Sequence, residues 1–247
     1  MGGGSPGGGG CGGAPPPPRA GGGGFSPPPP GSFLYGGRPF PGAAGGGGGP
    51  ARGRFTFAAS GGRTPWVMLR ALADEDVPWE AVELLQVDER VAPAGHADRN
   101  LTHLRRSLDH APLQSGQIHP MPVEATDLDA AAREYTGILE RLAAPSGRLD
   151  LIHLGLGPDG HTASLVPGAP ELDVRDSPVV VTGVYQGRRR MTLTFPVLDK
   201  ARRILWVVTG ADKREMLRRL REGDSTIPAG LVAPDAAVIM ADRAAAG

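Results

Sequence analysis

Two short, nearly continuous apolar runs constrain the fold most: LDLIHLGLG over residues 149–157 and RRILWVVTG over residues 202–210. A run of this length without alternating polar residues is typical of a strand that is covered on both faces, as in parallel sheets. Both runs are far shorter than the roughly 20 apolar residues that a membrane-spanning helix needs. We therefore expect a sheet that is buried between layers of helices.

The segments around these runs alternate between strand and helix patterns. The strand patterns are RFTFAA (54–59), AVELLQVDER (81–90), SPVVVTGV (177–184), MTLTFPVL (191–198) and AAVIMAD (236–242). The helix patterns are TPWVMLRALADE (64–75), DLDAAAREYTGILERLAA (127–144) and DKREMLRRLREG (212–223). This alternation predicts an α/β domain with a mostly parallel sheet over residues 54–247.

Residues 1–53 differ in composition, because they are mostly glycine, proline and alanine, with three arginines and no acidic residue. Glycine keeps much backbone freedom and proline lacks the N–H that helices and sheets use, so this segment cannot offset its ordering entropy. We expect it to be disordered. The alternative is a proline-rich ligand for a groove on a partner protein.

Charge and cysteine content narrow the class of protein. The chain has 26 basic and 26 acidic residues, so its total charge suggests neither a nucleic-acid nor a membrane partner. Its single cysteine, Cys11, excludes a disulfide framework and favours a reducing compartment. The N-terminus has no basic-then-apolar signal pattern, and we expect a cytoplasmic protein.

Four predicted strands end in residues that suit ligand binding: SGGRTP (60–65), DER (88–90), GLGPDGH (155–161) and TGADK (209–213). In open parallel sheets, ligands bind beyond the carboxyl ends of the strands. The predicted architecture therefore brings these four segments, which lie far apart in the sequence, to one edge of the sheet.

The SGGRTP segment has the features of a phosphate-binding turn. Gly61 and Gly62 allow a ligand to approach the backbone, Thr64 is a candidate N-cap, and Pro65 is a candidate first helical residue. The free N–H groups and the helix dipole would then favour a phosphate. A plain tight turn is an equally good interpretation of these residues.

Cationic side chains at two other strand ends suit the same ligand. The guanidinium fork of Arg90 matches phosphate or carboxylate oxygens, and Asp88 and Glu89 are candidates to orient it, although DER also fits an exposed charge cluster. Lys213 is one of only two lysines among 26 basic residues, the other being Lys200, and it starts a predicted helix. A lysine retained at this edge indicates a site that needs a compact ammonium group.

The GLGPDGH loop matches the glycine pattern of a dinucleotide-binding fingerprint, but its surroundings argue against a nicotinamide cofactor. The following HTASLV is cut short by Pro167, so we expect a helix of at most two turns. The acidic ribose ligand expected about 20 residues later is missing from SPVVV. The loop instead offers His161 at the start of that short helix, with Asp159 two residues before it. Imidazole titrates near neutral pH, so His161 is the candidate general base.

Other catalytic devices find no support in the sequence. The remaining histidines lack the paired spacing of metal ligands, so no metal site is expected. There is no Gly-x-Ser-x-Gly elbow, and Ser164 has no evident base.

Taken together, these segments resemble the 6-phosphogluconolactonase family. SGGRTP, DER, RNLTHL, GLGPDGHTASLVPG, RMTLTFPVLDKAR, VTGADK and MADRAAA occur in the family's order with similar spacing, from about residue 54 to the C-terminus. The resemblance implies a Rossmann-like, mostly parallel sheet with helices on both faces. It also implies hydrolysis of 6-phospho-D-glucono-1,5-lactone to 6-phosphogluconate, with no metal or organic cofactor.

The resemblance also implies roles for individual residues. His161 would activate water, Asp159 would orient the imidazole, and Arg90 and Lys213 would hold the phosphate with the backbone of residues 61–64. Asn100, His103 and Arg190 match family motifs and are assigned only a role at the substrate rim or in packing, and Asp88 and Glu89 are placed at the same rim.

The N-terminus departs from the family pattern. Family members begin with a further strand and helix, where this chain has its glycine-proline tract. We therefore expect an open sheet edge and a bared apolar face. Because Gly, Pro, Ala and Arg share GC-rich codons, we hypothesise that residues 1–53 come from a misread frame or start. The hypothesis fails if neither other reading frame encodes an amphipathic helix ahead of Arg54.

Two rival functions remain open. A glucosamine-6-phosphate deaminase shares the GG-TP loop and the DGH motif, although TASLVPG and DER favour the lactonase. The second rival is an inactive sugar-phosphate-binding protein that lacks the N-terminal elements.

Overall fold

The computed structural model describes residues 1–3, 34–35, 38–39, 53–233 and 235–247. The chain divides into two units, Met1–Phe40 and Pro41–Gly247. In the first unit, the short strands β1 (Leu34–Tyr35) and β2 (Arg38–Pro39) pair antiparallel. The predictions of disorder, of a proline-rich ligand and of a misread frame fall almost wholly outside the described residues.

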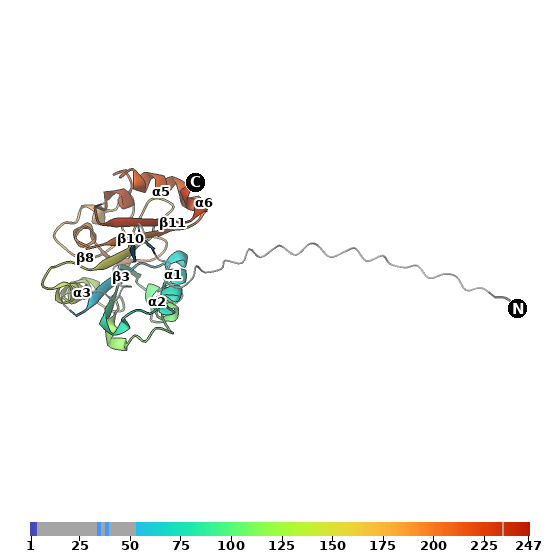
Figure 1. The fold of residues 1–247 in the computed structure, drawn as a ribbon, viewed down its shortest axis with the longest axis horizontal. Helices are drawn as coiled ribbons and strands as arrows, with labels where there is room; N and C mark the ends of the chain where they lie inside the picture. The colour runs from blue at the N-terminus through green and yellow to red at the C-terminus, as the bar shows by residue number, and fades with distance from the viewer. Residues whose placement is uncertain (4–33, 36–37, 40–52, 234) are drawn as a thin grey trace. The chain divides into compact units, whose positions relative to one another are not determined.

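The second unit is built on a six-stranded sheet in the order β11-β10-β7-β3-β4-β6, and every neighbouring pair is parallel (Figure 1). Its strands are β3 (Phe55–Ala59), β4 (Val82–Gln86), β6 (Ile118–His119), β7 (Leu151–Leu154), β10 (Ile204–Val208) and β11 (Ala237–Ala241). The apolar runs at 149–157 and 202–210 both contribute strands to this sheet, and these strands, β7 and β10, are neighbours. The prediction of a mostly parallel sheet is confirmed.

Helices cover both faces of this sheet because alternate strand residues point to opposite sides. On one side Phe57, Leu84, Leu151 and Leu205 pack with α1 (Arg63–Ala73) and α2 (Asn100–Ser107). On the other side Ala58, Leu85, Ile152 and Trp206 pack with α3 (Leu128–Ala143) and α5 (Arg214–Arg221). In Figure 1, α3 and the pair α1 and α2 accordingly lie on opposite sides of β3.

Short helices complete the described chain. They are α4 (Phe195–Leu198), α6 (Arg243–Ala246) and the 3₁₀ helices η1 (Trp79–Ala81), η2 (Ser115–Gln117), η3 (Pro170–Asp173), η4 (Ala211–Lys213) and η5 (Pro228–Leu231). No helix in the described ranges is both long enough and apolar enough to cross a membrane.

A second, antiparallel sheet was not predicted. It has the order β5-β9-β8, with β5 (Asp88–Arg90), β9 (Arg190–Leu193) and β8 (Val179–Val181). The predicted strand 81–90 is therefore two strands in two sheets. Val87 joins them, since its N–H donates to the Ala59 carbonyl of the large sheet and its carbonyl accepts from Leu193 of the small one.

Two further element predictions were wrong in part. The strand predicted over 191–198 ends at Leu193, and FPVL forms the short helix α4, because Pro196 in its first turn suits a helix start. The short helix predicted from His161 does not form. Ala163 takes a left-handed φ of 52°, and Thr162 and Leu165 bond to each other's backbone, so the chain turns at once.

Some apolar side chains of the second unit are exposed. Edge strand β11 is only half-buried, and its Met240 is 45% exposed, while Val67 on α1 is 60% exposed. The prediction that a covering strand and helix are lost concerns residues ahead of Arg54, which lie almost wholly outside the described ranges.

His153 is the one buried histidine of β7, and it lies in register with Ala59 and Leu205 on the flanking strands. Neither ring nitrogen has a hydrogen-bond partner among the described residues. Burial lowers the pKa of His153 to about 4. An unfolded histidine titrates near 6.5, so between roughly pH 6.5 and 4 the unfolded chain binds a proton that the fold excludes. Folding free energy is therefore lost as the pH falls through this window.

We expect His153→Leu to remove this acid sensitivity. At pH 7 the variant should be as stable as the unsubstituted chain or more so, because an apolar side chain replaces an unpaired polar one. Between pH 7 and 4.5 the unsubstituted chain should lose about 2–3 kcal/mol more than the variant. Urea unfolding at the two pH values measures the difference, with the exposed His110→Leu as control. Equal losses in all three proteins would contradict this account.

Candidate active site

The four strand ends singled out from the sequence meet at one edge of the large sheet. Strands β10, β7, β3 and β4 are consecutive neighbours and all run parallel, so their carboxyl ends lie side by side. Hydrogen bonds join the loops there, since Thr64 and Thr209 share a bond of 2.7 Å between hydroxyls and Ser60 Oγ donates to the His153 carbonyl. The predicted convergence of these segments is confirmed.

The loop after β7 holds His161 against Asp159. Nδ1 of His161 lies 2.6 Å from Asp159 Oδ1, and the His161 backbone N–H donates to the same oxygen at 3.2 Å. Burial opposes ionisation of Asp159, but the bonds from the His161 backbone, the imidazole and Tyr185 together hold the pKa of this carboxyl below its usual value. Asp159 is thus an anion beside the imidazole at neutral pH.

This geometry selects one tautomer of His161. When Nδ1 carries the proton and donates to Asp159, Nε2 keeps a free lone pair that can take a proton from water. The side chain is 19% exposed, so water reaches it. The pair has the arrangement of a general base with an orienting carboxylate.

Gly157 leaves the space that the His161 ring occupies. A Cβ built on Gly157 would overlap the imidazole, and the Gly157 N–H donates to the His161 carbonyl at 2.8 Å. A Cβ on Gly160 would instead meet Ile227. Two of the three glycines of the fingerprint pattern therefore make room for protein side chains.

Two arginines, Arg190 buried and Arg90 partly buried, lie opposite each other in the small sheet. Arg90 on β5 and Arg190 on β9 are directly paired in register, and the Nε of each is buried without a hydrogen-bond partner. Burial, and then the neighbouring Arg90 charge, lower the pKa of Arg190 against the opposing effect of Asp88. Two guanidinium groups with unmet donors are suited to hold one phosphate. Arg190, given only a rim or packing role from the sequence, therefore belongs with Arg90.

Asn100 at the start of α2 orients Arg90. Its Oδ1 accepts from Arg90 Nη1 at 2.7 Å, and its Nδ2 donates to the Asp88 carbonyl at 2.9 Å. A Cβ on Gly61 would overlap the Asn100 amide. Gly61 is therefore required for this packing, in addition to any approach of a ligand.

Asp88 and Glu89 are structural carboxylates rather than residues of an exposed rim. Glu89 is fully buried, accepts from the Asn100 and Leu101 backbone N–H groups at 2.7 and 2.8 Å, and pairs with Arg99 at 3.1 Å. It caps α2, where the helix dipole favours an anion. Asp88 is also buried and accepts from Ser164 Oγ at 2.6 Å. The rim prediction is wrong for both carboxylates.

The sequence left two roles open for His103, one at the substrate rim and one in packing, and its contacts are those of a packing residue. Its ring stacks on Trp66 with centroids 5.6 Å apart, and its Nε2 lies 2.8 Å from the Ala97 carbonyl oxygen.

The helix-start predictions for Thr64 and Lys213 need correction. Helix α1 begins at Arg63 with Gly62 as its N-cap, where a φ of 131° favours glycine, so Thr64 is not the cap and Pro65 is not the first helical residue. Lys213 ends the 3₁₀ helix η4 and is the N-cap of α5, with its Nζ 3.8 Å from the Asp212 carboxylate. Both residues still lie in the helical segments that directly follow the carboxyl ends of β3 and β10.

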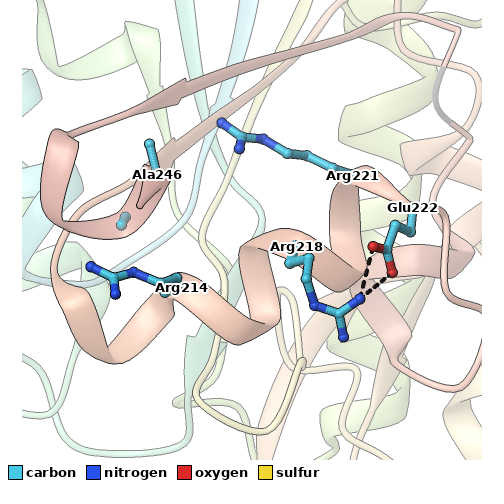
Figure 2. A pocket seen from close by; sticks show the side chains of 6 residues that line it. Arg214, Arg218, Arg221, Glu222 and Ala246 are labelled. Carbon is cyan, nitrogen blue, oxygen red and sulfur yellow. Dashed lines mark hydrogen bonds and ion pairs between the residues drawn. The ribbon is translucent and has the colours of Figure 1, made fainter.

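A separate hollow of about 400 Å³ lies between α5 and α6 (Figure 2). Its lining comprises Arg214, Arg218, Arg221, Glu222, Ala245 and Ala246, none of which belongs to the strand-end set. Arg218 is neutralised by Glu222 and Glu215, as Figure 2 shows for the first of these. The converging strand-end residues, and not this hollow, define the candidate site. Within the described ranges, no group of three or more His, Cys, Asp or Glu side chains is placed to hold a metal ion.

Tyr185 is the site residue that the sequence did not reveal. Its hydroxyl donates to Asp159 Oδ2 at 3.1 Å, and its ring meets the His161 ring edge-on at 5.5 Å. The residue lies 24 positions after His161, in a segment without a functional motif. The local pattern that could have pointed to it is the hairpin turn of YQGR (185–188).

Comparisons with known proteins place the chain in a family. Residues 49–241 match the sequence model of the glucosamine-6-phosphate isomerases/6-phosphogluconolactonase family. The 6-phosphogluconolactonase of Synechocystis sp. is 39% identical over 171 residues, which cover 67% of this chain and 71% of that protein. The Nostoc sp. 6-phosphogluconolactonase is 34% identical, with 79% of this chain and 85% of that protein covered.

Solved structures agree with these relatives. The crystal structure of 6-phosphogluconolactonase from Thermotoga maritima has a TM-score of 0.69 at 27% identity, with 77% of this chain and 86% of that chain covered. A monomeric glucosamine-6-phosphate deaminase shares the fold at 20% identity and a TM-score of 0.67. By its sequence match, its parallel sheet and its strand-end residues, the chain belongs to the glucosamine-6-phosphate isomerase/6-phosphogluconolactonase family.

Proposed function

We propose that this chain hydrolyses 6-phospho-D-glucono-1,5-lactone to 6-phosphogluconate, the second step of the oxidative pentose phosphate pathway. The Asp159–His161 pair at the carboxyl edge of the sheet carries the proposal, since it supplies a base for water and is linked through Tyr185 to Arg190, the register partner of Arg90. The relatives named as 6-phosphogluconolactonases support it.

The mechanism follows from the oriented imidazole. Nε2 of His161 takes a proton from water while the water oxygen attacks the lactone carbonyl carbon. The tetrahedral intermediate collapses with cleavage of the bond between this carbon and the ring oxygen, which takes the proton back from the imidazolium. Asp159 stabilises the imidazolium between these two transfers, so one histidine serves as base and then as acid.

The phosphate fixes the substrate for this attack. Arg90 and Arg190 offer unmet Nε donors, and Lys213 and the backbone of residues 61–64 lie at the same edge. We assign these groups to the phosphate, because a held phosphate limits the positions that the carbonyl carbon can take relative to His161.

We expect Lys213→Ala to weaken substrate binding more than turnover. Loss of one charged partner of the phosphate should raise KM by about 10- to 100-fold with a much smaller change in kcat. Steady-state kinetics with the lactone measures both constants. Lys200→Ala is the matched control, because Lys200 is the only other lysine and its carbonyl contact with Arg148 survives the substitution. A KM that rises equally in both variants would remove Lys213 from the phosphate site.

The deaminase rival is tested with its own substrate. The fold of this chain does not distinguish the deaminase from the lactonase activity, since a solved deaminase and a solved lactonase both share it. Purified chain incubated with 6-phosphogluconolactone and with glucosamine-6-phosphate should hydrolyse the first without releasing ammonia from the second. Ammonia release without lactone hydrolysis would overturn the proposal.

The inactive-protein rival is tested by comparing two N-termini. Lactone hydrolysis is assayed side by side in two proteins. One is the unsubstituted chain, and the other carries a family-type strand and helix ahead of residue 54. Robust turnover by the unsubstituted chain rejects the hypothesis of an inactive protein and supports residues 54–247 as the catalytic domain. The proposed pathway and the single cysteine support a cytoplasmic location, which cell fractionation tests.

A further inference from the structure

The hairpin between β8 and β9 brings a tyrosine to the catalytic pair. Tyr185 and Arg188 bond to each other's backbone across a two-residue turn, in which Gln186 and Gly187 have φ values of 50° and 79°. Positive φ at both central residues is the requirement of a type I′ turn, which gives a tight hairpin of defined register. The turn therefore sets the place of Tyr185 independently of the loop that carries His161.

The tyrosine side chain contacts both members of the pair. Its hydroxyl donates to Asp159 Oδ2 at 3.1 Å, while the other oxygen of Asp159 serves His161, and the hydroxyl lies 3.4 Å from His161 Nδ1. Both carboxylate oxygens are then engaged, so Asp159 cannot rotate without losing a bond. The edge-on ring packs against the imidazole at 71° and limits its movement.

Arg190 and Gln186 in turn hold the tyrosine. The Arg190 guanidinium lies over the Tyr185 ring at 4.9 Å from its centre, and its Nη2 contacts the Tyr185 carbonyl and Gln186 Oε1. Gln186 Nε2 donates to the Tyr185 hydroxyl at 3.3 Å. A hydroxyl that accepts this bond directs its own proton toward Asp159. Arg190 thus links the two-arginine cluster to the catalytic pair through Tyr185.

We propose that Tyr185 is a positioning residue of the lactonase site, which locks Asp159 and sets the pH at which His161 takes up its proton. The inference rests on the proposed function of His161 as base. The titratable and charged groups that the described contacts place around the imidazole are Asp159 at Nδ1, Tyr185 near the same nitrogen, and Arg190 over the tyrosine ring.

The phenol stays a donor throughout the working range. Burial, and then the hydrogen bond to the Asp159 carboxylate, raise the pKa of Tyr185 above its usual value. A donor on Asp159 spreads the negative charge of the carboxylate and weakens its hold on the imidazolium. Without the hydroxyl, Asp159 stabilises the imidazolium more strongly, so His161 is protonated at higher pH.

Tyr185→Phe tests the inference, because it keeps the ring over Arg190 and removes only the hydroxyl. We expect kcat to fall about tenfold. We also expect the acid limb of the plot of kcat against pH to move to higher pH by roughly half a unit or more. Tyr135→Phe is the control: it removes a buried hydroxyl that binds the Gln86 backbone at 2.8 Å, so it should lower stability without moving the acid limb. An acid limb that stays in place or moves down in Tyr185→Phe overturns the inference.

A measurement that does not depend on lactone hydrolysis tests this inference separately from the proposed function. The imidazole titration of His161 is followed by NMR in the full chain and in Tyr185→Phe, with the resonance assigned by its loss in His161→Ala. We expect the titration midpoint of His161 to be higher in Tyr185→Phe than in the full chain. When Asp159→Asn is present in both proteins, we expect the two midpoints to be the same. Equal midpoints in the first pair overturn the inference. A shifted midpoint in a chain that hydrolyses no lactone overturns only the proposed function.

Discussion

His161→Ala should remove most of the enzymatic turnover of the lactone while leaving sugar-phosphate binding in place. A positioned general base contributes typically 10²- to 10⁴-fold, so kcat should fall by about that factor once spontaneous hydrolysis is subtracted. Arg90, Arg190 and Lys213 remain, so 6-phosphogluconate should bind with nearly unchanged affinity. Stopped-flow kinetics measures the first quantity and titration calorimetry the second.

Controls separate loss of the base from loss of the fold. His110→Ala removes an exposed histidine and should leave both constants unchanged. The thermal unfolding temperature of His161→Ala should stay close to that of the unsubstituted chain, because the ring is partly exposed. Full activity in His161→Ala would show that another group activates the water.

Gly157→Ala should cost nearly as much activity as His161→Ala, although it removes no chemical group. The added methyl overlaps the imidazole, so His161 must leave the position in which Asp159 holds it. A displacement of about 1 Å at a reacting group costs on the order of 10²-fold in rate. The loss should appear in kcat, because the arginines that we propose to bind the phosphate are untouched.

Gly155→Ala in the same loop is the matched control. A Cβ there meets no atom within 4 Å, and the glycine does not need a left-handed backbone. We expect its kcat to stay within about twofold, as for other substitutions that create no clash. If Gly157→Ala matches Gly155→Ala in kcat, the position of the imidazole is not what limits the reaction.

The pattern of apolar residues predicted the architecture well. The covered runs at 149–157 and 202–210 became adjacent strands, because residues without a polar face can only be buried on both sides. The parallel arrangement then implied that the loops carrying Arg90, His161 and Lys213 share one edge. Chain order and strand direction are enough for that conclusion.

Short-range geometry was harder to predict. The turn after His161 replaced a predicted helix because Ala163 adopts a left-handed φ that no sequence pattern marks. The strand over 81–90 divided at Val87, which bonds to both sheets. Both places also bond to distant segments: Ser164 bonds to Asp88 and Thr192, and Val87 bonds to Ala59 and Leu193.

By itself, the sequence determined the parallel α/β sheet, the edge that carries the site, and the pairing of His161 with Asp159. These follow from burial, chain direction and a separation of two residues. The tertiary structure alone decided that Glu89 caps a helix, that Arg190 lies beside Arg90, and that Tyr185 reaches Asp159. Those contacts depend on strand register and hairpin geometry, which bring together residues up to 100 positions apart and which no local pattern encodes.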